Sequence, residues 1–122
     1  MSLPLSDTAL FRTECYINGQ WCPAESGARL AIKNPATGEV IAEVAKVGAE
    51  ETRRAIAAAE TAMGDWRQVP AKQRASVRRN WFNLIMENQE DLARSMTTEQ
   101  GKTLAESRGE VAYGASYIEW FA

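Results

Sequence analysis

The chain has 122 residues, 45% hydrophobic and 25% charged, which is enough for one small domain with an apolar core. Its 14 basic and 16 acidic residues leave a formal charge of −2, which argues against nucleic acid or an anionic membrane surface as a partner. The sequence shows neither the apolar run of a membrane span nor the pattern of a secretory signal. We therefore expect a cytoplasmic protein.

The sequence contains no histidine, the usual general base near neutral pH and the most frequent metal ligand. Ser-His and Cys-His catalysis are thereby excluded within this chain, and two cysteines alone cannot complete a tetrahedral zinc shell. Two cysteines are also too few for a disulfide framework, and a reducing compartment keeps them as thiols. Any chemistry here depends on carboxylates, lysines or a thiol activated in another way.

Three segments follow one another along the chain. Residues 1–14 lack clear periodicity, and we expect a flexible N-terminal segment there. Residues 15–47 form a β-hairpin and strand segment, whose later strands are predicted at 30–32 and 40–44 with a proline and glycine turn between them. Residues 48–122 form a helical segment.

Asn18 and Gly19 predict a tight hairpin at the start of the strand segment. They lie between two short apolar runs, and a type I′ turn needs the positive φ angles that Asn and Gly tolerate. The same stretch carries Cys22, and a thiol becomes a nucleophile only beside a base, a cation or a helix N-terminus. None of its immediate sequence neighbours supplies such a group. Two interpretations stay open at this point: a catalytic Cys22, or a strand residue with an ordinary thiol.

Three or four amphipathic helices are predicted in the last segment. The first has acids in its first turn, which the helix dipole favours, and it is expected to end at Gly64. Pro70 starts a second helix, or a bent pair, that stops near Gly101. The last helix begins at Thr103 and reaches Ala122 without a cap or a proline stop. We expect a chain cut in mid-helix, with an α+β fold as a fragment.

Several stretches together resemble the N-terminal region of the aldehyde dehydrogenase family: YINGQW, NPATGEVI, AEETRRAI and TEQGKTLAE. The stretch RGEVAYGASYIEWFA is similar to NAD(P)-dependent succinate-semialdehyde dehydrogenases in particular. The resemblance covers residues 15–122 and departs from the family at Thr103, where most members have proline. It implies an incomplete coenzyme-binding domain, part of an α/β aldehyde dehydrogenase fold, in a parent that oxidises succinate semialdehyde to succinate.

Family members use NAD or NADP and pass through a thiohemiacetal on a cysteine. The resemblance implies that the nucleophile, the glutamate base and the coenzyme-binding glycines lie beyond Ala122, so this chain alone is expected to be inactive and to hold no coenzyme. Its expected partners are the remainder of the parent chain and, as a homo-oligomer, further copies. The family's nucleophile motif, Phe-x-Asn-x-Gly-Gln-x-Cys, has one residue more than this chain has between Asn18 and Gly19, which favours the hairpin interpretation of Cys22.

The resemblance also implies two smaller roles. In several family members a monovalent cation is held by two carbonyls before the Asn-Pro turn and an acid before the Gly-Lys step, which correspond here to Ile32, Lys33 and Glu99. Oxygen ligands suit a hard cation, although the remaining ligand comes from later in the family's chain. The last helix lines the aldehyde tunnel in relatives, and Tyr113 and Tyr117 lie there one turn apart. An exposed Glu99 and plain packing of the tyrosines are the alternatives.

A second hypothesis belongs to a different class of function. The chain would be a stand-alone helical module that uses its apolar helix faces to pair with itself or with another protein, without catalysis. A stop codon directly after Ala122 favours this hypothesis, whereas a continuing reading frame favours the dehydrogenase.

Overall fold

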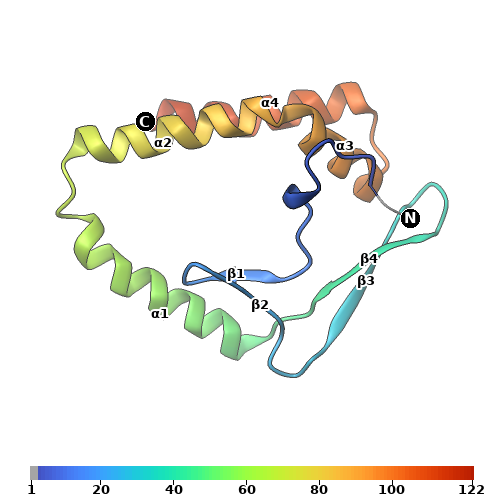
Figure 1. Ribbon diagram of the computed structural model, residues 1–122, viewed down its shortest axis with the longest axis horizontal. Helices are drawn as coiled ribbons and strands as arrows, with labels where there is room; N and C mark the ends of the chain where they lie inside the picture. Colours follow the sequence, from blue (N-terminus) through green and yellow to red (C-terminus); the bar gives the residue numbers. More distant parts are fainter. Residues whose placement is uncertain (1–2) are drawn as a thin grey trace.

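The structure is a computed structural model that describes residues 3–122, in which two antiparallel hairpins precede four α-helices (Figure 1). Met1 and Ser2, part of the segment expected to be flexible, lie outside the described residues. The predicted α+β class, with strands first and helices afterwards, is confirmed. In chain order the elements are η1 (Thr8–Leu10), β1 (Cys15–Ile17), β2 (Gln20–Cys22), β3 (Arg29–Lys33), β4 (Val40–Ala45), α1 (Ala49–Trp66), α2 (Ala71–Glu87), α3 (Gln89–Gln100) and α4 (Leu104–Trp120).

Strands β1 and β2 form the tight hairpin predicted from Asn18 and Gly19. Both turn residues have positive φ, 50° and 77°, as a type I′ turn requires. The two strands pair in register around this turn, so that Cys22 lies opposite Cys15. The prediction that Cys22 is a strand residue is therefore confirmed.

Strands β3 and β4 form the second hairpin, close to the predicted ranges. The turn between them is closed by the Gly38 amide, which donates to the Asn34 carbonyl at 2.8 Å. Near the turn the ladder shifts register: Ile32 pairs with Ala42 and Lys33 with Val40, so one residue of β4 bulges out. The two hairpins belong to separate two-stranded sheets.

Helix α1 begins at a polar cap and runs beyond its predicted end. The Glu51 carboxylate accepts hydrogen bonds from the Gly48 amide at 2.8 Å and from the Glu25 amide at 2.7 Å, which ties the start of the helix to the loop after β2. The predicted end at Gly64 is wrong, because α1 continues to Trp66. A single glycine costs a helix only about 1 kcal/mol, which flanking helix formers offset.

The predicted bent pair consists of two helices, α2 and α3, which meet at Asn88. Gly101 ends α3 in the left-handed conformation, with φ 78°. Thr103 caps α4, because its hydroxyl accepts a hydrogen bond from the Glu106 amide at 3.2 Å. The predicted boundaries at Gly101 and Thr103 are confirmed.

Helix α4 lies along α2 and α3, and these three helices hold most of the core (Figure 1). Small side chains allow the helices to approach closely: Ala93 and Ala115 are buried, and the Ser107 hydroxyl lies 2.8 Å from that of Thr97. Helix α1 extends away from this bundle and, among the described elements, lies near β1 (Figure 1).

Large apolar side chains lie exposed on the helices. Ile56 and Met63 of α1 are 62% and 50% exposed, and Trp81 of α2 is 58% exposed. These residues lie in helices, as predicted, but within residues 3–122 no other element covers their side chains. No helix of this described part is long and apolar enough to cross a membrane.

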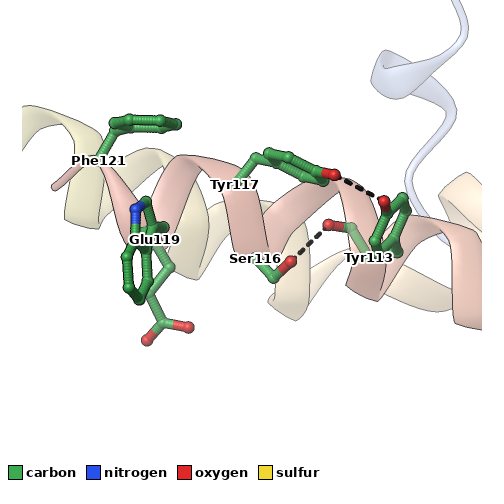
Figure 2. Close-up of a pocket in the computed structure, with 6 residues that line it drawn as sticks. Tyr113, Ser116, Tyr117, Glu119 and Phe121 are labelled. Atoms are coloured by element: carbon green, nitrogen blue, oxygen red, sulfur yellow. Dashed lines mark hydrogen bonds between the residues drawn. The ribbon is translucent and has the colours of Figure 1, made fainter.

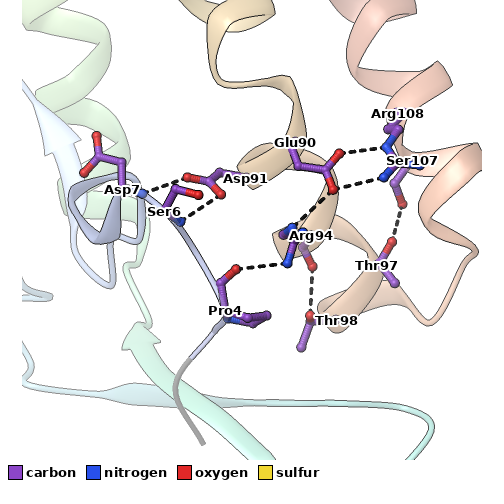
Figure 3. Close-up of polar contacts among 10 residues, drawn as sticks. All are labelled: Pro4, Ser6, Asp7, Glu90, Asp91, Arg94, Thr97, Thr98, Ser107 and Arg108. Carbon is purple, nitrogen blue, oxygen red and sulfur yellow. Dashed lines mark hydrogen bonds and ion pairs between the residues drawn. The ribbon is translucent and has the colours of Figure 1, made fainter.

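The segment before β1 lies against α3 (Figure 3). The Asp91 carboxylate accepts hydrogen bonds from the Ser6 amide at 3.0 Å and the Asp7 amide at 2.8 Å, and Arg94 donates to the Pro4 carbonyl at 3.4 Å. The predicted flexibility of residues 1–14 stays a prediction. The structure shows that the backbone of residues 4, 6 and 7 contacts α3.

Candidate functional site

Tyr113 and Tyr117 lie one turn apart on α4, and their side chains point toward each other (Figure 2). Their hydroxyl oxygens are 2.6 Å apart, and their rings meet edge to face with centroids 5.1 Å apart. Spacing of four residues on a helix places side chains on one face, which explains the contact. Both rings remain more than half exposed.

The two tyrosines belong to an open apolar hollow at the end of α4 (Figure 2). Trp120 and Phe121, both largely exposed, complete it together with Ser116 and Glu119. The Glu119 carboxylate pairs with Arg79 of α2 at 2.5 Å, which links this end of α4 to its neighbour. The hollow therefore presents aromatic surface, two phenolic hydroxyl groups, the Ser116 hydroxyl and the Glu119 carboxylate.

The contact between the two hydroxyls shifts the pKa of one tyrosine in this hollow. The hydrogen bond with Tyr113, together with partial burial, raises the pKa of Tyr117 above its ordinary value. The phenol therefore keeps its proton at neutral pH, because even an unperturbed tyrosine has a pKa of about 10. The Tyr117 phenol can donate a hydrogen bond to a carbonyl or carboxylate oxygen, but it is not a general base near neutral pH.

The turn after β3 packs against the end of α3. A methyl group at Gly101 would lie 2.8 Å from Pro35 Cγ, and the backbone there has φ 78°. Both features favour glycine, which has no Cβ and adopts the left-handed conformation readily. This contact brings the residues before the Asn-Pro turn toward the acid before Gly101.

Two of the three residues predicted for a monovalent cation line one hollow. Ile32 and Glu99 face a space of about 390 Å³ that Trp21 also lines, and Lys33 is not among the lining residues. Across residues 3–122, no three His, Cys, Asp or Glu side chains gather in a way that could hold a metal ion. The predicted cation site uses backbone carbonyls, and it stays a prediction.

Cys22 is the last residue of β2, at the open end of a hairpin, and it does not lie at the start of a helix. Its thiol donates a weak hydrogen bond to the Cys15 carbonyl at 3.5 Å. A nucleophilic thiol is normally activated by a base, a cation or a helix N-terminus. The structure thus gives Cys22 a cross-strand cysteine as its neighbour.

Sequence reasoning missed the carboxylates that connect distant segments. Hydrogen bonds from the Asp7 and Ser6 amides hold the pKa of Asp91 below its ordinary value, with Arg94 nearby as a further cause. Glu90 accepts from the Arg108 guanidinium at 2.7 and 3.0 Å, and this pairing lowers the pKa of Glu90 (Figure 3). No local pattern marks the partners of Glu90 and Asp91, because these partners lie far away in sequence.

The part of the chain that runs from β2 to the end of α4 matches a known family. The model of the aldehyde dehydrogenase family matches residues 21–122, and the chain belongs to this family.

Within the family, the chain is similar to semialdehyde dehydrogenases. It is 58% identical over 98% of its length to glutarate-semialdehyde dehydrogenase of Pseudomonas putida, and 54% identical over 98% to succinate-semialdehyde dehydrogenase [NADP(+)] of Escherichia coli. It covers 25% of each of these relatives. The crystal structure of succinate-semialdehyde dehydrogenase from Burkholderia pseudomallei is 50% identical with a TM-score of 0.93, covering 96% of this chain and 24% of that one. The chain thus spans about a quarter of its relatives' length.

Proposed function

We propose that this chain is the N-terminal portion of an NAD(P)-dependent dehydrogenase that oxidises succinate semialdehyde to succinate. The observation that carries the proposal is the identity of 54–58%, over 98% of the chain, to dehydrogenases named for succinate and glutarate semialdehyde. These two aldehydes each carry a terminal carboxylate and differ by one methylene group. A binding site separates such a pair by only about 1–3 kcal/mol, so both belong in the test.

The test is the kcat/KM of the full-length parent for succinate semialdehyde, glutarate semialdehyde and an uncharged aldehyde of similar length, each with NAD and with NADP. We expect succinate semialdehyde to be the best substrate and the uncharged aldehyde the poorest. A higher kcat/KM for glutarate semialdehyde would overturn the assignment of substrate but keep the class. If no aldehyde were oxidised with either coenzyme, the proposal would fail as a whole.

The role proposed for Tyr113 and Tyr117 is to line the path of the aldehyde. The support is their placement on one face of α4, where two hydroxyls and an aromatic surface stand together. In the full-length parent, Tyr113→Ala should change KM or kcat for the aldehyde, because it removes both ring and hydroxyl. Tyr16→Ala, at an exposed tyrosine of β1, is the matched control and should leave both constants unchanged. Unchanged constants in the Tyr113 variant would remove this residue from the path.

We further propose that the remainder of the parent covers the exposed apolar side chains of α1 and α2, and that the isolated 122 residues neither oxidise aldehyde nor hold coenzyme. The support is the exposure of large apolar side chains such as Ile56 and Trp81, because contact of apolar surface with water is unfavourable. The isolated chain should bind an apolar dye more strongly than the parent does at equal molar concentration. Equal dye binding would contradict the proposed cover, and coenzyme-linked aldehyde oxidation by the isolated chain would contradict its inactivity.

A further inference from the structure

The two cysteines of the chain lie directly opposite each other in the β1–β2 hairpin. The ladder pairs Cys15 with Cys22, two steps from the turn, and the turn residues Asn18 and Gly19 hold this register through their positive φ angles. The residues beside a two-residue turn form a hydrogen-bonded pair, and hydrogen-bonded pairs alternate with non-hydrogen-bonded pairs along the ladder. The cysteines therefore occupy a hydrogen-bonded pair, in which Cα atoms lie about 5.5 Å apart, well inside the span of a disulfide.

The side chains of both cysteines stand on one face of the hairpin. Alternation along a strand puts Cys15 and Cys22 on the same face of the hairpin, and the Cys22 thiol reaches across to the Cys15 carbonyl at 3.5 Å. Both residues are free thiols and partly exposed, so a small reagent can reach them.

The opposite face of the hairpin holds the pair in position. Tyr16 and Trp21 are also directly opposite each other, with ring centroids 5.0 Å apart. The guanidinium of Arg12 lies over the Trp21 ring, 5.1 Å from its centroid. These contacts favour one register of the short hairpin and with it the alignment of the two thiols.

We propose that Cys15 and Cys22 form a reversible dithiol–disulfide pair that responds to small disulfides such as oxidised glutathione. The thiolate of one cysteine attacks a sulfur of oxidised glutathione, forming a mixed disulfide and releasing one glutathione thiolate. The thiolate of the other cysteine then attacks the protein sulfur of that mixed disulfide, and the second glutathione thiolate leaves. The two cysteines lose two electrons and two protons in total, and one oxidised glutathione becomes two reduced molecules.

A bridge at a hydrogen-bonded position is easily reduced. Side chains of hydrogen-bonded pairs stand farther apart than those of non-hydrogen-bonded pairs, so the bridge must draw the two Cβ atoms together. Disulfides that depart from relaxed geometry, or that are exposed, are reduced more readily and serve as regulatory bonds. The pair is therefore suited to opening and closing with the redox state around it.

The experiment equilibrates the full-length parent with reduced and oxidised glutathione, blocks free thiols with an alkylating agent, and digests the protein with trypsin. Cleavage after Arg12 and Arg29 places both cysteines in one peptide, 13–29, whose mass separates the dithiol, the mixed disulfides and the internal bridge. In urea the unfolded chain between the two cysteines is a flexible loop, in which one thiol meets the other at an effective concentration on the order of 1 mM. With ~1 mM reduced glutathione, the unfolded protein should therefore form about equal amounts of bridge and mixed disulfide. In the native protein we expect the ratio of bridge to mixed disulfide to be about tenfold higher.

Three variants test whether the hairpin creates the pair. Cys15→Ser and Cys22→Ser should each leave only a mixed disulfide on the remaining thiol. Gly19→Ala strains the turn, at φ 77°, and should lower the native ratio toward the value in urea, whereas Gly27→Ala, at φ 69° with open space around it, is the matched control and should leave the ratio unchanged. A native ratio no higher than the ratio in urea, or cross-linking of either cysteine to another peptide in place of the bridge, would overturn the proposal.

Discussion

Replacing Gly101 by alanine tests the contact between the Asn-Pro turn and the end of α3. Two costs arise from the structure. The new Cβ must adopt φ 78°, which costs a non-glycine residue about 1–2 kcal/mol. The same Cβ would lie 2.8 Å from Pro35 Cγ, and because the proline ring cannot rotate away, relief of this overlap costs about a further 1–3 kcal/mol. We expect Gly101→Ala to lower the free energy of unfolding by about 2–5 kcal/mol in total.

A matched control separates the two costs. Gly38 has nearly the same φ, 75°, but nothing within 4 Å of its added Cβ, so Gly38→Ala should show only the backbone cost. Gly64, within α1 and also in open space, should instead gain about 0.5–1 kcal/mol on replacement by alanine. In a Pro35→Ala background, the cost of Gly101→Ala should fall to that of Gly38→Ala, because alanine keeps only the Cβ at 3.8 Å.

The assay is equilibrium unfolding in urea, followed by far-ultraviolet circular dichroism, with the slope of the transition checked for constancy between variants. The informative quantity is the difference between the Gly101→Ala and Gly38→Ala losses, which we expect to be about 1–3 kcal/mol. Equal losses for the two variants, or a loss at Gly101 that does not change when Pro35 is removed, would refute the packing of this turn on α3.

Two further predictions concern proton equilibria. Because hydrogen bonds from backbone amides depress the pKa of Asp91 in the folded protein, its contribution to stability is present above the unfolded-state pKa and is lost as the pH falls through the folded-state pKa. Asp91→Asn should therefore weaken the dependence of the unfolding free energy on pH in the acid range, as measured by urea unfolding at several pH values. An unchanged dependence would contradict the hydrogen bonds between Asp91 and the amides of Ser6 and Asp7. Tyr113→Phe removes the partner hydroxyl and should lower the pKa of Tyr117 toward its ordinary value, as measured by ultraviolet absorbance. An unchanged midpoint for Tyr117 would mean that the hydroxyl contact does not exist in solution.

Features that depend on neighbouring residues could be predicted from the sequence. Asn18 and Gly19 form the tight turn because only a few residue types tolerate positive φ, and Thr103 caps α4 because its hydroxyl reaches a nearby amide. The spacing of Tyr113 and Tyr117 placed both on one helix face, and their contact follows from that spacing. For the candidate site, the sequence thus located the tyrosine pair.

Features that depend on distant residues could not be predicted. Asp91 meets the amides of residues 6 and 7 across more than eighty positions of chain, and no local pattern marks such a pairing. The helix end expected at Gly64 failed because propensity is a weak preference that the surrounding helix overrides. The position of Cys22 opposite Cys15 follows from the register of β1 and β2. The sequence predicted the turn between these strands, but we did not derive the register from it.

The sequence by itself determined the order of strands and helices, the tight turns and the cap of α4, because each follows from short-range sterics and hydrogen bonding. It also determined which helix faces are apolar, through their periodicity. Only the tertiary structure decided which of those faces are buried: Val111 and Ala115 enter the core, whereas Ile56 and Met63 remain exposed. The physical reason is that burial depends on which elements meet in space, and these meetings involve residues far apart in the chain.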